Sequence, residues 1–110
     1  MSGYAHVIDR ADSTCSLLSG DAREQGRRVV VLCRELSGRP RWEGRLLAEP
    51  ADASLRLELG RLVESLARGG AKGIPLATLG RAALADLAGD VAAQAQALRA
   101  CDENLTLAGL

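Results

Sequence analysis

The segment from residue 29 to residue 48 constrains the fold more than any other, because its residue types, its turn and its charges agree on a β-hairpin. Residues 29–36 are apolar and β-branched, whereas residues 41–48 alternate apolar with charged side chains. The tetrapeptide Ser37-Gly38-Arg39-Pro40 separates the two arms and supplies the turn. The register that follows pairs Arg34 with Glu43, Cys33 with Gly44, Val31 with Leu46 and Val29 with Ala48. Opposite charges and apolar residues thus meet across the predicted strands.

The second half of the chain predicts three Leu/Ala-rich helices, over residues 53–68, 76–88 and 91–101. The first follows a capping Asp52 or Ser54 and stops at Gly69. Alternate leucines in residues 54–59 also indicate a strand, but the helical stripe is longer, so the strand is the alternative. The apolar tail from residue 105 to residue 110 is compatible with a docked segment or a final strand.

A short N-terminal strand completes the predicted fold. Residues 4–9 alternate weakly and contain Val7 and Ile8, which is typical of a strand. This strand would extend the hairpin into a three-stranded antiparallel sheet, covered on one face by the C-terminal helices. The sequence therefore predicts an α+β fold in a single domain over residues 1–110.

Charge is balanced over the whole chain but uneven along it. Lys plus Arg and Asp plus Glu both total 14, so the bulk positive charge of a dedicated nucleic-acid binder is missing. Residues 23–45 nevertheless hold seven Arg against three Glu. The predicted hairpin is therefore the basic pole of a neutral protein. The ratio of thirteen Arg to one Lys suggests a GC-rich bacterial genome.

The number of cysteines and the hydropathy of the sequence indicate the cellular compartment. The sequence has three widely spaced cysteines, an odd number that argues against a disulfide framework and suits a reducing cytoplasm. The N-terminus has no basic lead followed by an apolar run, and no window reaches the roughly 18 apolar residues of a membrane span. We therefore expect a cytoplasmic protein without membrane contact.

The candidate binding residues are Arg39, Arg41, Trp42 and Arg45. Three guanidinium groups beside an indole would suit a phosphate, a carboxylate or an acidic protein. The alternative is a solvated strand face whose arginine stems cover the core and whose tryptophan fills it. The binding hypothesis requires the arginines on one surface together with an exposed indole.

Other groups of residues give weaker indications of a functional site. Residues 69–73 contain glycine and Lys72 but lack the order of a phosphate-binding loop, which favours a joint between helices. His6, Asp9, Asp12 and Cys15 have no spacing that requires nucleophilic catalysis, and neither they nor the other cysteines show paired metal-ligand spacing. Residues 84–98 resemble a helix-turn-helix in outline, but the second helix offers mainly Ala, and Asp86 and Asp90 would repel a DNA backbone.

These observations favour a non-catalytic protein-interaction module: an adaptor, assembly factor or regulatory subunit that also forms a homodimer. The predicted partner is another protein, for which acidic character would suit the basic hairpin, and no cofactor or metal is expected. Two alternatives stay open. One is a helix-turn-helix type DNA-binding regulator, and the other is a small ligand-binding domain or enzyme that uses the Arg/Trp surface.

Overall fold

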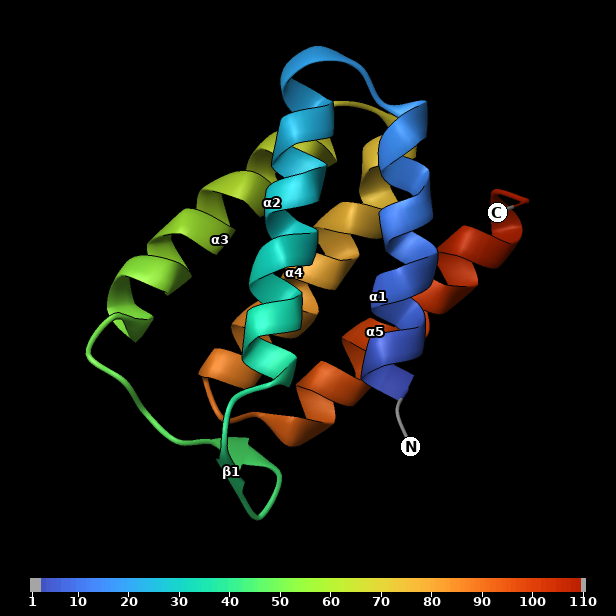
Figure 1. Cartoon of the computed structure of the whole chain (residues 1–110). Coiled ribbons are helices and arrows are strands. Elements are labelled where there is room, and N and C mark those ends of the chain that lie inside the picture. The colour runs from blue at the N-terminus through green and yellow to red at the C-terminus, as the bar shows by residue number, and fades with distance from the viewer. Residues whose placement is uncertain (1–2, 110) are drawn as a thin grey trace.

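Helices make up most of the chain (Figure 1). The computed structural model describes residues 3–109, and its helices are α1 (Gly3–Thr14), α2 (Gly20–Ser37), α3 (Asp52–Arg68), α4 (Ile74–Leu87) and α5 (Val91–Leu107). Single 3-10 turns follow α1 (Cys15–Leu17) and precede α4 (Ala71–Gly73). Between α2 and α3, two short strands, β1 (Arg41–Trp42) and β2 (Arg45–Leu46), pair antiparallel. The fold is thus mostly helical with a small two-stranded antiparallel sheet, in rough agreement with the α+β class.

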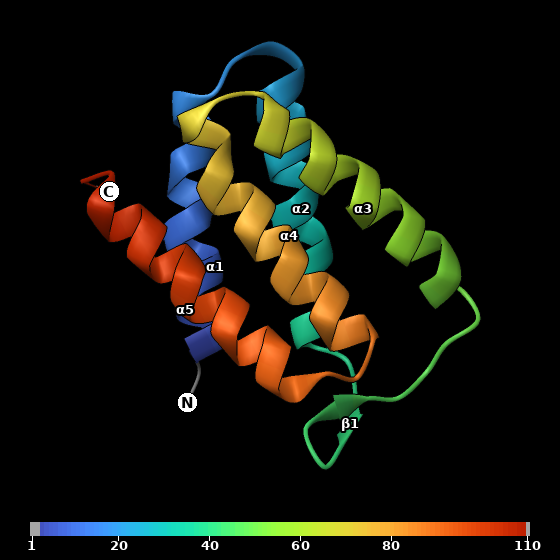
Figure 2. The same ribbon diagram turned by 180° about the vertical axis from the view of Figure 1, so that it is seen from behind.

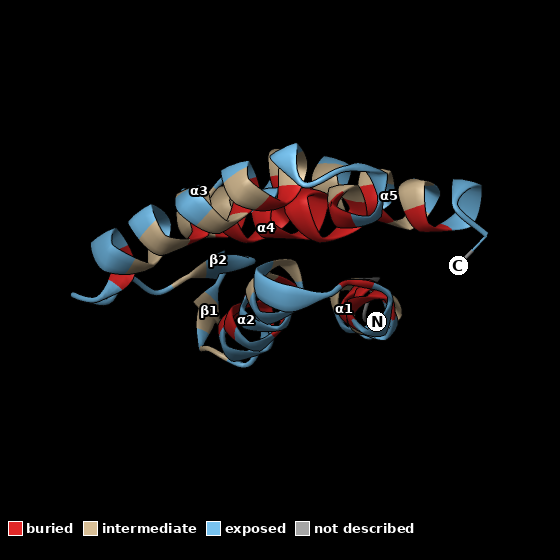
Figure 3. Ribbon diagram, turned by 90° about the horizontal axis from the view of Figure 1, so that it is seen from above, coloured by how far each residue is buried: buried red, intermediate tan, exposed pale blue. Residues whose placement is uncertain are grey.

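The helices form two layers (Figure 3). In one layer α3, α4 and α5 lie side by side with α4 in the middle, and α1 and α2 form the second layer against them. Buried residues therefore extend around most of α4: Pro75, Leu76, Ala77, Thr78, Leu79, Gly80, Ala82, Ala83 and Asp86. A helix whose sequence is apolar nearly all round is expected in such a central place.

Glycines let the helices approach one another closely. A Cβ at Gly80 of α4 would lie 2.5 Å from Cγ2 of Val63 in α3. One at Gly26 of α2 would lie 2.7 Å from Cδ1 of Leu76. Both distances are well below van der Waals contact, so a larger side chain at either glycine would require the neighbouring side chain to move.

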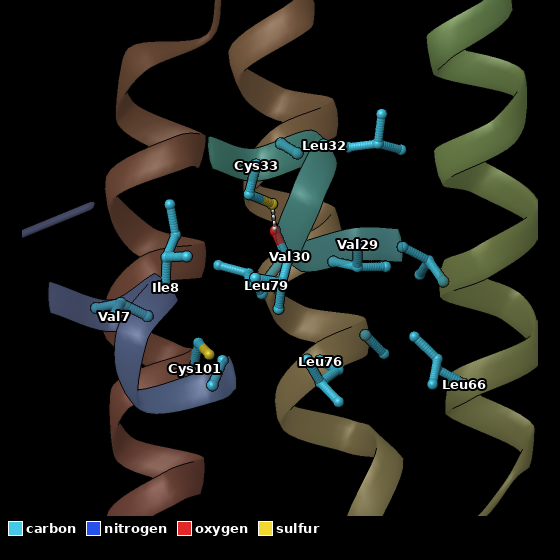
Figure 4. Close-up of a cluster of buried hydrophobic side chains, with 14 of the residues drawn as sticks. Val7, Ile8, Val29, Val30, Leu32, Cys33, Leu66, Leu76, Leu79 and Cys101 are labelled. Carbon is cyan, nitrogen blue, oxygen red and sulfur yellow. Dashed lines mark hydrogen bonds between the residues drawn. The ribbon is translucent and has the colours of Figure 1, made fainter. Parts of the chain in front are cut away.

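The core between the layers consists of aliphatic side chains and cysteine (Figure 4). Val30 and Cys33 of α2 pack toward Leu79 of α4, and the Cys33 thiol donates a hydrogen bond to the Leu79 carbonyl (Sγ to O, 3.8 Å). Ile8 of α1 and Cys101 of α5 belong to the same buried cluster. Small and aliphatic residues therefore fill the interior without a large aromatic side chain at its centre.

The predicted first arm of the hairpin is wrong, because residues 29–36 belong to α2. The buried positions follow helical spacing: Val29, Val30, Leu32, Cys33 and Leu36. Val31 between them is 44% exposed. Arg34 consequently binds Asp9 and Asp12 of α1, at 3.0 and 3.2 Å, and not Glu43. Packing of the apolar stripe against α4 overrides the strand preference of the valines.

The predicted N-terminal strand is also wrong, since residues 4–9 lie in α1. The apolar residues there share one helical face: Tyr4, Val7, Ile8 and Ala11. Among residues 3–109, strands are confined to the short hairpin, so no three-stranded sheet forms.

The three predicted C-terminal helices are confirmed as α3, α4 and α5. The strand alternative for residues 54–59 is excluded because they lie in α3. The strand alternative for the tail is excluded through Leu107, where α5 ends, and Leu105 is buried in the core, as the docked alternative requires. Within the described part of the chain, every helix is too short or too polar to traverse a bilayer.

Candidate functional site

The hairpin between α2 and α3 is a tight two-residue turn with its strands in fixed register. Arg41 pairs with Leu46 and Trp42 pairs with Arg45, so Glu43 and Gly44 form the turn. Both turn residues have positive φ, 52° and 81°, which is the signature of a type I′ turn. The Leu47 amide donates to the Pro40 carbonyl (3.2 Å) and extends the pairing by one step. The predicted hairpin is therefore wrong in its turn and its register. The turn lies at Glu43 and Gly44 and not at residues 37–40, and the predicted second arm, residues 41–48, folds back on itself and contains both short strands.

Strand alternation gives this hairpin two different faces. Arg41 and Leu46 are half-buried and face the helices, and Leu46 packs against the core. The opposite face, here called the outer face, consists of Pro40, Trp42, Arg45 and Leu47, all exposed. The Trp42 indole is 71% exposed. The hairpin projects from one end of the helical layers (Figure 1). The Arg45 side chain also lies near the joint between α4 and α5, because a Cβ at Gly89 would lie 3.9 Å from its Cδ.

Arg41 anchors the inner face of the hairpin to α4. Its Nη1 and Nη2 lie 2.7 and 2.8 Å from the two carboxylate oxygens of Asp86, a residue that is 3% exposed. The same guanidinium donates to the carbonyl of Leu36 at the end of α2 (3.1 Å) and to that of Gly44 in the turn (3.2 Å). A bidentate arginine in this position fixes both the place and the tilt of the hairpin.

Arg39 holds together the segment that leads from the hairpin to α3. Its guanidinium donates to both carboxylate oxygens of Asp52 (2.8 and 3.3 Å) and to the carbonyl of Leu47, and its Nε lies 3.4 Å from a carboxylate oxygen of Glu49. The Glu49 amide also donates to Asp52 (3.0 Å). The Arg39 guanidinium holds the pKa of the Asp52 carboxyl below its usual value.

The four predicted binding residues are therefore divided between two roles. Arg39 and Arg41 direct their charges inward to aspartates, while Trp42 and Arg45 stand on the outer face, and among residues 3–109 the structure gives Arg45 no ion pair. The neighbouring surface includes Val91 at the start of α5, because a Cβ at Gly44 would lie 3.9 Å from its Cγ2. The surface thus carries one exposed indole and one exposed guanidinium from the predicted set.

Sequence reasoning missed the aspartates that hold the hairpin. Asp86 lies 45 residues after Arg41 and Asp52 lies 13 residues after Arg39. One signal for Asp86 was present: it is the single acidic residue in the apolar sequence of α4 and falls on its buried side. A charge in such a place requires an opposite charge nearby.

The thiols and the N-terminal polar residues do not assemble a reactive centre. Burial raises the pKa of Cys33 and of Cys101 to about 12, and it also raises the pKa of Cys15. The carboxylates of Asp9 and Asp12 bind Arg34. No group of three or more metal-ligating side chains comes together among the described residues.

The segments that resemble known binding motifs have packing roles. Helices α4 and α5 lie side by side along their length (Figure 2), Gln94 of α5 is buried, and Asp86 is engaged by Arg41. Residues 69–73 form the joint between α3 and α4, as predicted. Hollows on the surface lie on α3 around Leu57 and between α1 and α5 around Leu98, away from the hairpin.

Comparison with known proteins adds no relative: no protein-family model, no curated protein and no solved structure matches this chain. The function is therefore argued from the geometry of the site.

Proposed function

We propose that this chain is a non-catalytic protein-interaction module, acting as an adaptor, assembly factor or regulatory subunit, whose docking element is the outer face of the hairpin. The observation that carries the proposal is the exposed Trp42 on a hairpin held in place by two arginine–aspartate pairs. Tryptophan and arginine are the residue types most enriched where truncation weakens protein binding most.

Anchoring supports a docking role because it prepares the surface before a partner arrives. Arg41 joins the hairpin to α4 and to the end of α2, and Arg39 joins it to the start of α3. Little conformational freedom is then left to lose on binding, which is the main benefit of a preorganised surface. A large indole on such a support has few rotatable bonds and a large contact area.

The position of the hairpin suits binding better than chemistry. It projects from the helices (Figure 1), whereas small-molecule sites are concave and enclose most of their ligand. Arg45 beside Trp42 adds a cation that would orient a partner through a carboxylate. These features favour a protein partner over a small ligand.

The test is a quantitative pull-down in which the tagged, full chain is incubated with an extract of its source organism. We expect at least one protein, which can be another copy of this chain, to be retained by the unmodified chain. Its retention should fall by about thirtyfold with Trp42→Ala, the effect of losing a hot-spot residue. Leu107→Ala is the matched control, because Leu107 is also exposed but lies at the end of α5. Identical sets of bound proteins with and without Trp42 would overturn the proposal.

A further inference from the structure

A hollow of about 320 Å³ lies on the surface between α1 and α5, and these two helices supply all of its lining residues. The helices pack against each other on the side of the molecule opposite α3 (Figure 3). The lining residues are His6 and Val7 of α1 and Ala95, Leu98, Arg99 and Asp102 of α5. A volume of this size falls at the lower end of the range of small-molecule sites. The hollow is separate from the hairpin, which carries the proposed function.

The part of the hollow that lies on α5 is a single helical face with an apolar half. Residues 95, 98, 99 and 102 follow the spacing i, i+3, i+4, i+7 that places side chains on one side of a helix. Ala95 and Leu98 are half-buried, and together with the buried Val7 they form the apolar floor of the hollow. Because Ala95 has only a methyl group, the floor keeps space that a longer side chain at this position would fill.

The acid of the hollow, Asp102, already has its charge paired. The Arg10 guanidinium in α1 donates to the Asp102 carboxylate in α5, and its Nη1 also lies 3.4 Å from Oγ1 of Thr106. This ion pair joins the two helices at the end of the hollow where Asp102 lies. A carboxylate neutralised in this way repels a bound anion much less than a free carboxylate would.

The cation of the hollow, Arg99, is by contrast available to a ligand. It is exposed, and it forms no ion pair within residues 3–109. Glu103, four residues further along α5, has a spacing that permits such a pair, yet the described structure does not contain it. His6 is exposed on the opposite helix and can donate from a ring N–H. The hollow thus combines an apolar floor with two donors for an anion.

We propose that this hollow binds a small amphipathic carboxylate, whose apolar tail lies on Val7, Ala95 and Leu98 and whose carboxylate pairs with Arg99. The planar guanidinium fork of arginine matches the two oxygens of a carboxylate. His6 is the second donor. A helix of a protein partner would need a longer row of apolar contacts than these three side chains offer. The hollow is open to solvent, so the affinity is modest and depends on both the tail and the charge.

The test compares three ligands that share one aliphatic tail: octanoate, octan-1-ol and octylamine. Each is titrated into the ¹⁵N-labelled full chain at neutral pH, and amide chemical shifts measure both the affinity and the place of binding. Octanoate should shift the amides of residues 6–7 and 95–102. It should bind about fivefold more tightly than octanol, which is the effect of one solvent-exposed ion pair. Octylamine should bind most weakly, because it brings a second cation to Arg99.

Two variants with matched controls separate the contribution of the tail from that of the charge. Ala95→Leu fills the floor and should abolish the binding of octanoate and octanol alike, whereas Gln96→Leu adds a leucine at an exposed position of α5 outside the hollow and should change neither. Arg99→Gln should weaken octanoate about fivefold and leave octanol unchanged. Arg81→Gln removes an exposed charge from α4 and should alter neither ligand. Circular dichroism of each variant verifies that the fold is retained.

Several results would overturn this proposal. They are equal affinities for octanoate and octylamine, shifts that map to another part of the chain, the absence of any saturable shift, and octanoate binding that survives Ala95→Leu. The result is also independent of the proposed function. Trp42→Ala, which tests the hairpin, should leave octanoate binding unchanged, because Trp42 does not line the hollow.

Discussion

Asp86 is the residue on which the position of the hairpin depends most. It is a buried carboxylate that receives two hydrogen bonds from Arg41. Asp86→Ala would leave the half-buried guanidinium without its partner, and we expect a loss of about 3 kcal/mol in the free energy of unfolding. The double variant R41M/D86L removes both charges and should be more stable than Asp86→Ala, because no unpaired charge remains in it. Urea denaturation followed by circular dichroism measures both. A double variant less stable than Asp86→Ala would show instead that Arg41 stabilises the fold without Asp86, through its hydrogen bonds to the carbonyls of Leu36 and Gly44.

Asp52 is a second residue whose contribution to stability can be tested, because it should make the stability of the protein depend on pH. Its pKa is lowered from the ordinary value of 3.8, chiefly by the hydrogen bonds from Arg39. Folding thus favours the ionised carboxylate. Its contribution to stability is complete above the pKa of the unfolded chain and is lost as the pH falls through the lower pKa of the folded chain. The stability difference between the unmodified chain and Asp52→Asn should be constant above about pH 5 and should shrink below about pH 4. Thermal unfolding from neutral to acid pH measures it. Glu24→Gln, at an exposed site, is the control, and an Asp52→Asn difference that grows in acid would contradict the assignment.

At the scale of elements, the sequence predicted those helices in which several local signals coincide. For α3 a long leucine stripe and a glycine stop agreed, and the predicted start differs from Asp52 by one residue. The predicted cap is wrong, because the N-cap position is Ala51, without a side-chain cap, and not Asp52 or Ser54. For α2 the local signals conflicted. The strand preference of β-branched residues is on the order of 1 kcal/mol, whereas burial of one valine or leucine contributes about 1.5 to 3 kcal/mol. Burial of a whole helical face therefore decided the structure of residues 29–36, and the apparent Arg34–Glu43 pairing was a coincidence of charge spacing.

The site could be predicted only in part for a related reason. The binding hypothesis required an exposed indole, and Trp42 is exposed. The alternation in residues 41–48, however, predicted a single strand, whereas the chain turns back at Glu43 and Gly44 and so places Trp42 and Arg45 on the same face. The inward roles of Arg39 and Arg41 depend on where α3 and α4 pack, which no local pattern encodes. The buried acid in α4 was the one readable sign that an arginine had to come from elsewhere.

The joint between α3 and α4 gives an element-scale prediction about glycine. A Cβ at Gly73 would overlap the backbone carbonyl of Leu66, which cannot rotate away as a side chain can. Gly73→Ala should therefore destabilise the protein by about 1 to 3 kcal/mol. Gly60→Ala is the matched control, because nothing lies within 4 Å of a Cβ there and the site is inside α3. It should stabilise by about 0.5 to 1 kcal/mol through helix propensity. Chemical denaturation measures both, and the opposite order would disprove this account of the joint.

At the scale of the whole molecule, α4 connects all the other helices. It packs between α3 and α5 in its own layer and contacts α2 and α1 in the other. Either layer alone would expose the apolar side chains that now lie between the layers, and the loss of that burial would exceed the stability of an ordinary domain. The two layers should therefore not unfold independently.

Leu76 tests this dependence, because it is fully buried on α4 and its Cδ1 lies 2.7 Å from where a Cβ at Gly26 of α2 would be. Leu76→Ala should lower the free energy of unfolding by about 2 to 5 kcal/mol. If the helices form one cooperative unit, amide hydrogen exchange should accelerate by the same factor in the slowest amides of α1, α2, α3 and α5, and not in α4 alone. Leu57→Ala, at a leucine that is 64% exposed, should change stability by less than about 0.5 kcal/mol. Acceleration confined to the layer of α3, α4 and α5 would show instead that α1 and α2 unfold separately, and the hairpin would then be fixed by only one of the two layers to which Arg41 joins it.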